Sequence, residues 1–509
     1  MESVPKRPVR LTKRGRLRAG AVGAALSVCI IAAAVSSAST PRVTTPPVPV
    51  TVSGTAVGPG IAPGFVGLAT EYWNVENEVG TDPNKPDTAF EQVVRNLSPY
   101  GGLSLRIGGD STDWTWFPIP GMKTPPWVRW TMTPTWAAVT KRLVADLHAH
   151  LIIGINMEAG SLKVADAEVH EIRSAVAGSA PITFELGNEP ELYSHFAFYH
   201  DKAGAAVLGR SHSYSLSNMA TQWNQMADAL PDVPFAGPGY SGLSALPAVA
   251  QFLQESHRLK LLTVHTYPLK SARCDGGANL GESNLFDQAS LQGLGSGLVA
   301  WTSLARHYGV GVRVDEMNSV TCGGSPSFSK TFGPALWALN ILPLYVEAGV
   351  AGVNFQSRPY TAQNLIQTVH THAGWSVQVQ PEYYGLAAFA RLAPPGSKLL
   401  PVPTLPSGLY AWAVRTPQGQ EHVVITNVAA GARSVAIQAP GASGSASVET
   451  LRAGSGGLWA TAGATLGGQT LAADSGALHG TQVAKTVRSA RGAYDVTVAP
   501  ASAAIITFR

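Results

Sequence analysis

Short apolar runs alternate with longer amphipathic stretches from residue 61 to residue 394. This alternation is typical of successive βα units, because parallel strands are buried on both faces and need a crossover helix. Eight such units can close a barrel. We therefore predict an α/β fold, a (β/α)8 TIM barrel at 61–394. Its strands are expected at 64–70, 103–109, 151–157, 182–188, 234–239, 261–267, 311–317 and 351–357, with intervening helices that include 136–150, 215–230, 298–309 and 331–349.

The residues after 394 have a different character. Gly, Ala, Ser, Thr and Val dominate, and alternating runs such as EHVVITNV and SAAIITFR are separated by turn residues. Alternation with a period of two indicates antiparallel strands. We predict a C-terminal antiparallel β-sandwich domain at 395–509. The segment 48–60 starts with the same alternation and is predicted to pair with this domain, after a Pro-rich linker at 39–47.

The first 18 positions hold seven basic residues and one acid, and an apolar run at 19–35 and small residues follow them. This layout is that of a secretory signal peptide cleaved after Ala38, with an uncleaved anchor at 1–38 as the alternative. We expect an exported protein, secreted or at the cell surface. Beyond this segment no basic stripe remains, which argues against nucleic-acid binding. Membrane contact is expected only through such an anchor.

Two glutamates at the ends of apolar runs are the candidate catalytic residues. Glu189 lies in FELGNEPELY (184–193) and Glu316 in VRVDEMNSV (312–320). The carboxyl ends of barrel strands meet on one face, so these carboxylates can approach each other. Glycosidic bond cleavage uses such a pair, and a separation of about 5–5.5 Å indicates a retaining enzyme. Alternatively, each glutamate only caps the following turn. Asp315 should point away from Glu316, unless a bulge reverses the alternation.

Other polar and aromatic residues are expected on the same face. Asn188 could bind a sugar hydroxyl, and Tyr267 could hydrogen-bond the nucleophile. Arg106 could hold the nucleophile ionised, although an ion pair within the barrel is the alternative. His265 is as consistent with a structural role as with substrate contact. Four tryptophans near the second strand could stack on sugar rings or serve as core: Trp114, Trp116, Trp127 and Trp130.

The chain has three cysteines, and Cys29 would leave with the signal peptide. Cys274 follows the sixth strand and Cys322 the seventh, so both are expected on neighbouring loops of the active face. An even pair in an exported chain favours a disulfide. We predict a Cys274–Cys322 bond, with two free thiols as the alternative.

Several segments carry a resemblance to a known family: LRIGGDSTD, ELGNEPELY, VHTY and DEMNSVTCGGSPSFSKTFGPALWAL. On these motifs, residues 48–509 resemble a clan A retaining glycoside hydrolase of family 79, the group of β-glucuronidases and heparanase. The resemblance implies that Glu189 is the acid/base and Glu316 the nucleophile. It also implies that Asn188 lies beside the sugar 2-hydroxyl and that the nucleophile has two partners, Arg106 and Tyr267.

The same resemblance bears on the substrate. Heparanase-like members present Tyr-Gly-Gly after the nucleophile to bind the uronate carboxylate, whereas this chain has Thr321, Cys322 and Gly323 there. The amides of Gly323 and Gly324 could still bind a carboxylate, and Tyr360 could add a hydroxyl. Further candidates for sugar contacts are Glu71, at the end of the first strand, and Asp110, after the second.

We therefore expect a retaining glycoside hydrolase that acts on β-linked glycans, foremost β-glucuronides, without a metal or organic cofactor. Two alternatives stay open. One is a neutral-sugar β-glycosidase on the same barrel, which the missing tyrosine favours. The other is a non-catalytic glycan-binding cell-surface protein, against which the presence of both glutamates argues.

Overall fold

The computed structural model describes residues 46–274, 282–372, 374–442 and 444–508. The predicted signal peptide or anchor at 1–38 lies outside the described residues, as does the linker up to residue 45. Among the helices of the described ranges, none is both long enough and apolar enough to span a bilayer.

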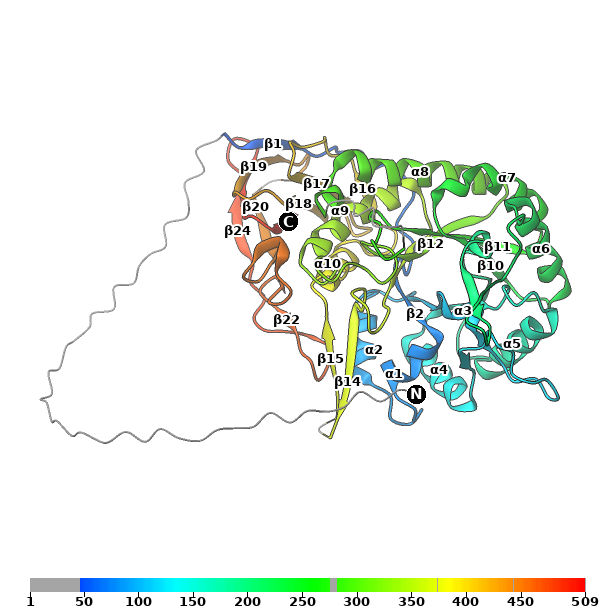
Figure 1. Cartoon of the computed structure of the whole chain (residues 1–509). Coiled ribbons are helices and arrows are strands. Elements are labelled where there is room, and N and C mark those ends of the chain that lie inside the picture. Colours follow the sequence, from blue (N-terminus) through cyan, green and yellow to red (C-terminus); the bar gives the residue numbers. More distant parts are fainter. Residues whose placement is uncertain (1–45, 275–281, 373, 443, 509) are drawn as a thin grey trace, which may run out of the picture. The chain divides into compact units, whose positions relative to one another are not determined.

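Parallel strands close a barrel in this part of the chain, in the order β10-β11-β12-β13-β2-β3-β6-β7 (Figure 1). The predicted TIM barrel is therefore confirmed, and each predicted strand is present close to its expected bounds. The strands are β2 (Val66–Glu71), β3 (Ser104–Gly108), β6 (His150–Ile155), β7 (Ile182–Leu186), β10 (Phe235–Tyr240), β11 (Leu259–Thr266), β12 (Gly311–Met317) and β13 (Val353–Gln356).

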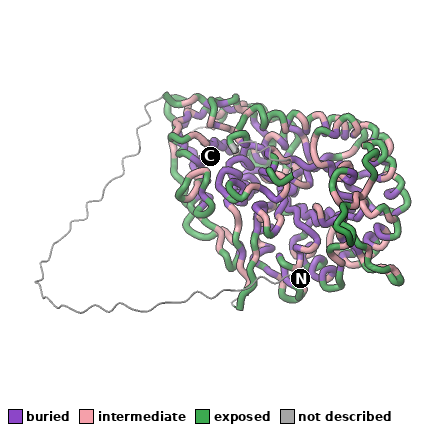
Figure 2. The backbone as a smooth tube through the Cα atoms, in the orientation of Figure 1, coloured by how far each residue is buried: buried purple, intermediate pink, exposed green. Residues whose placement is uncertain are grey.

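The barrel strands are buried almost throughout; every residue of β2, β3 and β10 is buried (Figure 2). This burial explains why the strands appear in the sequence as continuous apolar runs and do not alternate. Polar residues interrupt these runs mainly toward the carboxyl ends. The barrel therefore gathers its charged side chains at one end.

The crossover helices begin where the sequence supplies caps. Thr133, Ser161 and Ser215 each accept a hydrogen bond from a backbone amide of the first helical turn. The helices of more than one turn are α1 (Val75–Val79), α2 (Thr88–Arg95), α4 (Pro134–Leu147), α5 (Leu162–Ala175), α6 (Leu216–Ala229), α7 (Leu246–Glu255), α8 (Gln288–His307), α9 (Gly333–Ala348) and α10 (Glu382–Leu392).

The helix predicted at 298–309 is longer than expected. It is α8, which begins at Gln288 because Asp287 caps it by accepting a hydrogen bond from Ser290 N at 2.8 Å. Glycines at 293, 295 and 297 hide its periodicity in the sequence. Two hairpins on the barrel were also not predicted: β8–β9 (Ala197–His200, Ala206–Leu208) and β14–β15 (Ile366–Thr371, Gly374–Val379).

The C-terminal residues form the predicted antiparallel sheet domain. Its larger sheet contains β16 (Lys398–Leu400), β17 (Leu409–Arg415), β18 (Glu421–Asn427), β26 (Ser502–Phe508), β20 (Ser445–Arg452), β21 (Thr465–Leu466) and β24 (Lys485–Arg488). The smaller sheet has the order β1-β19-β25, with bounds Val48–Thr51, Arg433–Gln438 and Tyr494–Val498. Strand β1 comes from the other end of the chain and pairs in parallel with β19.

Both faces of the larger sheet are buried at β18. Val423 and Ile425 pack in the core between the two sheets, whereas Val424, between them in sequence, belongs to the barrel core. This is the period-two alternation of a strand whose two faces meet different apolar layers. The sheet is thus the middle layer between the barrel helices and the smaller sheet.

Candidate active site

Arg106 is the centre of the charged cluster at the carboxyl end of the barrel. It lies on β3 and is fully buried. Its Nε donates to Glu185 Oε2 at 2.7 Å, Nη1 to Glu316 Oε2 at 2.8 Å and Nη2 to Asn188 Oδ1 at 2.9 Å. The planar guanidinium therefore fixes side chains from two strands, β7 and β12, and from the loop after β7. Both roles predicted for Arg106 therefore apply. It forms an ion pair within the barrel, and its partners include the candidate nucleophile Glu316.

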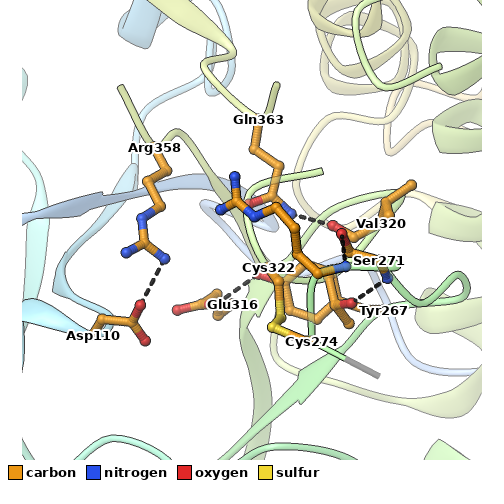
Figure 3. The surroundings of a disulfide bond; sticks show 11 residues. Asp110, Tyr267, Ser271, Cys274, Glu316, Val320, Cys322, Arg358 and Gln363 are labelled. Carbon is orange, nitrogen blue, oxygen red and sulfur yellow. Dashed lines mark hydrogen bonds and ion pairs between the residues drawn. A yellow bond between two sulfur atoms is a disulfide. The ribbon is translucent and has the colours of Figure 1, made fainter. Parts of the chain in front are cut away.

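Glu316 has the surroundings of an ionised carboxylate. Besides Arg106, it accepts a hydrogen bond from the Tyr267 hydroxyl at 2.6 Å (Figure 3). Burial alone would raise the pKa of Glu316, but the positive charges of His265 and Arg106 lower it below its usual value. A carboxylate kept charged in a buried site can act as a nucleophile.

Asp315 corrects the prediction made from strand alternation. Its Oδ2 lies 2.8 Å from Arg106 Nε, so it faces the same guanidinium as Glu316 and does not point away. The register of β12 shifts against β11 and again against β13 near this point, which breaks the period of two. Glu185 shares the same site, and burial raises its pKa to about 8. Arg106 and His265 instead lower the pKa of Asp315, so the pKa values of these two neighbouring carboxyls shift in opposite directions.

Glu189 has the opposite environment to Glu316. It follows β7 in a left-handed conformation (φ 50°), and burial raises the pKa of its carboxyl. His265 Nδ1 lies 2.8 Å from Glu189 Oε1, and this contact opposes part of that rise. His265 is fully buried, and the pKa of its imidazole is raised by Glu316 and Asp315 despite the burial. It joins the two candidate glutamates electrostatically.

Asp113, which sequence reasoning missed, holds the loops after β6 and β7 together. Its carboxylate accepts hydrogen bonds from Met157 N, Glu158 N, Asn188 N and the Tyr193 hydroxyl, at 2.8–3.3 Å. This network fixes the backbone beside Glu189. The side-chain oxygen of Asn188 remains available to accept the hydrogen bond from Arg106. The signal in the sequence was the motif LRIGGDSTD, in which a second acid follows Asp110.

A second charged group lines the neighbouring side of the barrel end. Glu71 accepts from Ser111 N at 2.9 Å and from Gln356 Nε2 at 3.2 Å, and burial raises its pKa to about 7. Arg358 lies 3.7 Å from Glu71 and 2.6 Å from Asp110 (Figure 3). Arg358 was also missed, although its position directly after the eighth strand would have indicated it. Glu71 and Asp110 therefore lie beside the same guanidinium, as their positions at two neighbouring strand ends predicted.

The predicted disulfide is present between Cys274 and Cys322, with Cα atoms 6.2 Å apart (Figure 3). It joins the loops after β11 and β12. Near it, Thr321 Oγ1 accepts from Ser271 N at 2.8 Å. The Gly324 amide donates to Thr321 O at 3.0 Å. It is therefore engaged within the loop, whereas we expected it to be available to a substrate carboxylate.

The predicted aromatic residues divide into two groups. Trp116 and Trp127 are buried in a small cluster with Phe198, and Trp130 packs on Tyr72 and Trp136, so these rings serve the core. Trp114 is half-buried, with the Arg129 guanidinium 3.9 Å over its ring. Tyr360 does not reach the Arg106 cluster; it is 87% exposed at the rim.

Comparison with known proteins supports this picture of the fold. The sequence matches no protein-family model. It is 22% identical over 387 residues to a β-glucuronidase of Neurospora crassa, covering 69% of this chain and 67% of the relative.

Among solved structures, a 4-O-α-L-rhamnosyl-β-D-glucuronidase from Fusarium oxysporum, determined as a Rha-GlcA complex, has a TM-score of 0.67 at 17% identity and covers 90% of this chain and 100% of its own. An α-L-arabinofuranosidase from Thermotoga maritima has a TM-score of 0.61 at 17% identity, covering 90% and 99%. The chain has the barrel fold of clan A glycoside hydrolases. It is a distant homologue of the Neurospora β-glucuronidase.

Proposed function

We propose that this protein is a retaining glycoside hydrolase of β-linked glycosides, with β-glucuronides as its first candidate substrates. One observation carries the proposal: two glutamates at the same barrel end have opposite electrostatic environments. Ion pairing lowers the pKa of Glu316, whereas burial raises that of Glu189. A nucleophile that stays ionised and an acid that stays protonated are the two groups of a double displacement.

In the proposed mechanism Glu316 attacks the anomeric carbon while Glu189 protonates the departing oxygen. Tyr267 and Arg106 orient the attacking carboxylate through the contacts at 2.6 and 2.8 Å. Glu189, deprotonated in this step, then takes a proton from water, which hydrolyses the glycosyl-enzyme ester at Glu316. His265, in contact with Glu189, stabilises the carboxylate form that exists between the two steps.

Stereochemistry tests the proposal directly. With a 4-nitrophenyl β-glycoside, ¹H NMR of the first product formed should show the β-anomer, which only later equilibrates with the α-anomer. An α-anomer as first product, which would fit carboxyl groups about 6.5–9.5 Å apart, would exclude the double displacement.

The preference for uronides is supported by Arg358 and by the distant relatives. Arg358 is one-quarter exposed, so part of its guanidinium stays accessible beside Glu71 and Asp110. The neighbouring Gly323 amide makes no hydrogen bond within the part of the chain that the structure describes. A guanidinium and a backbone amide are both suitable partners for a sugar carboxylate.

A second candidate is a neutral-sugar β-glycosidase. It is favoured by the hydrogen bonding and the residue types in the loop that carries Cys322. The Gly324 amide already donates to Thr321 O, which leaves one donor fewer for a carboxylate than the resemblance implies, and Thr321 stands where the resemblance expects a tyrosine. Comparing kcat/KM on aryl β-glucuronide, β-glucoside and β-galactoside separates the candidates, because a uronidase should lose most of its activity when the carboxylate becomes a hydroxymethyl group.

We also propose that the protein is exported. The basic start, apolar run and small residues at 1–38 support it, as does the disulfide of the described chain. Amino-terminal sequencing of the protein from the culture medium should read from Ser39. Intact residues 1–38 on a cell-associated protein would instead indicate an anchor.

A further inference from the structure

A pair of aromatic rings, one half-buried and one exposed, lies outside the charged clusters. Trp73 and Tyr360 are stacked, with ring centroids 6.0 Å apart and planes 7° apart. Tyr360 is 87% exposed, and its backbone is in the left-handed region at φ 60°. A bulky residue in this conformation is costly, and such costs concentrate at binding sites. We call Trp73 and Tyr360 the aromatic pair.

The turn that carries Tyr360 is fixed from several sides. Thr361 Oγ1 donates to Arg358 O at 2.7 Å and accepts from Gln363 N at 3.1 Å. Ala362 N donates to Gly323 O at 2.8 Å, which ties the turn to the disulfide loop. The exposed ring is therefore held in place by its backbone, and a ligand would not have to order it.

The aromatic pair is continuous with the wall of the candidate active site. Trp73 comes two residues after Glu71, and Tyr360 two residues after Arg358. Glu71, the last residue of β2, is 3.7 Å from Arg358, which lies on the loop after β13, and the two strands are neighbours in the barrel. In the closed strand order, β13 is the strand opposite β7, and Glu189 lies on the loop after β7.

We propose that the aromatic pair binds the sugar ring attached to the non-reducing side of the sugar whose bond is cleaved. This inference rests on the proposed function. The leaving group must lie beside its proton donor Glu189, so the far side of the barrel receives the non-reducing part of the substrate. Pyranose rings stack their C–H faces on aromatic rings, and the open face of Tyr360 offers such a surface.

The substrate class follows from this position. The enzyme takes glycans with at least two sugars on the non-reducing side of the scissile bond. It therefore cleaves inside a chain or releases a product of at least two sugars, and a lone terminal monosaccharide is a poorer substrate.

The experiment compares glycosides that differ by one ring. The probes are 4-nitrophenyl β-glucuronide and its 4-O-β-glucosyl derivative, together with 4-nitrophenyl β-glucoside and β-cellobioside. One of the two pairs contains the sugar that the wild type cleaves. Within that pair, kcat/KM of the wild type should be higher for the longer glycoside. Tyr360→Ala should lower the ratio of long to short about tenfold, and Tyr360→Phe should keep it, because only the ring is required.

Trp459→Ala is the matched control, since Trp459 is 53% exposed but lies on the sheet domain, and it should leave the ratio unchanged. A Tyr360→Ala variant that keeps the wild-type ratio, or a Phe variant that loses it, would overturn the proposal. If the wild type cleaves none of the probes, the proposed function fails by itself. In that case, calorimetry with the same glycosides decides whether the longer glycoside binds more tightly than the shorter one and whether Tyr360→Ala removes this difference.

Discussion

At the residue scale, burial acts on both glutamates, but only Glu316 is also bonded to Arg106 and Tyr267, and these contacts separate the two carboxyls. Glu316 should therefore be indispensable. Glu316→Gln is expected to abolish turnover, because an amide cannot form the glycosyl ester. Glu189→Ala should lose about 10²- to 10⁴-fold on glycosides with alkyl leaving groups but much less on 2,4-dinitrophenyl glycosides, which need little protonation. Steady-state kinetics on both substrate classes provides the measurement.

Glu191 is the matched control for Glu189, because it is a neighbouring carboxyl that accepts from Ser241 N at 2.7 Å. Glu191→Gln should lower activity on both leaving-group classes equally, if at all. An equal loss on both classes for Glu189→Ala would contradict its role as the acid.

His265 should set the pH range of activity. The acid limb of kcat/KM reports ionisation of Glu316 and the alkaline limb deprotonation of Glu189. His265 lowers the pKa of both carboxyls. Removing its charge in His265→Gln should raise both pKa values and move both limbs to higher pH. His422→Gln, in the sheet domain, is the control. Limbs that stay in place or move down would show that the imidazole is neutral in the enzyme.

The sequence predicted which residues gather at the barrel end better than it predicted how they pair. Glu189, Glu316, Asn188, Arg106 and Tyr267 lie together as their strand ends indicated. Asp315 could not be placed, because a register shift in β12 depends on the neighbouring strands and leaves no local signal. Arg358 could have been found from its position after the eighth strand.

At the scale of the elements, the barrel strands were predictable because burial on both faces makes them continuous apolar runs. The start of α8 was not, since its glycines interrupt the helical pattern and only the Asp287 cap marks it. The β14–β15 hairpin was not predicted, because its strands are largely exposed and lack a continuous buried face.

The disulfide links two loops of the active face, and its removal should cost stability. A Cys274→Ser/Cys322→Ser double variant should lose about 3–4 kcal/mol in the free energy of unfolding, because the bond closes a loop with a sequence separation of 48. Chemical denaturation of the exported protein measures this value. Reduction of the wild type is the control and should reproduce most of the loss. Two titratable thiols in the unreduced, denatured protein would refute the bond.

At the scale of the whole molecule, the smaller sheet depends on a strand from the start of the described chain. Val50 of β1 is fully buried in the core between the two sheets, and the adjacent Thr51 is exposed. Val50→Asp should destabilise the protein by at least about 3 kcal/mol, because it buries an unpaired charge. Thr51→Asp should change stability by no more than about 0.5 kcal/mol. Similar melting temperatures for the two variants would mean that β1 contributes little to the fold.

The parallel pairing of β1 with β19 also dictates when the molecule can be completed. Val48–Thr51 leaves the ribosome long before its sheet partners at 433–438 and 494–498. The early strand stays unpaired until these later residues have been synthesised. A product of premature termination, even one that includes the entire barrel, keeps this apolar strand exposed and is therefore chemically distinguishable from the finished protein by the surveillance machinery of the cell.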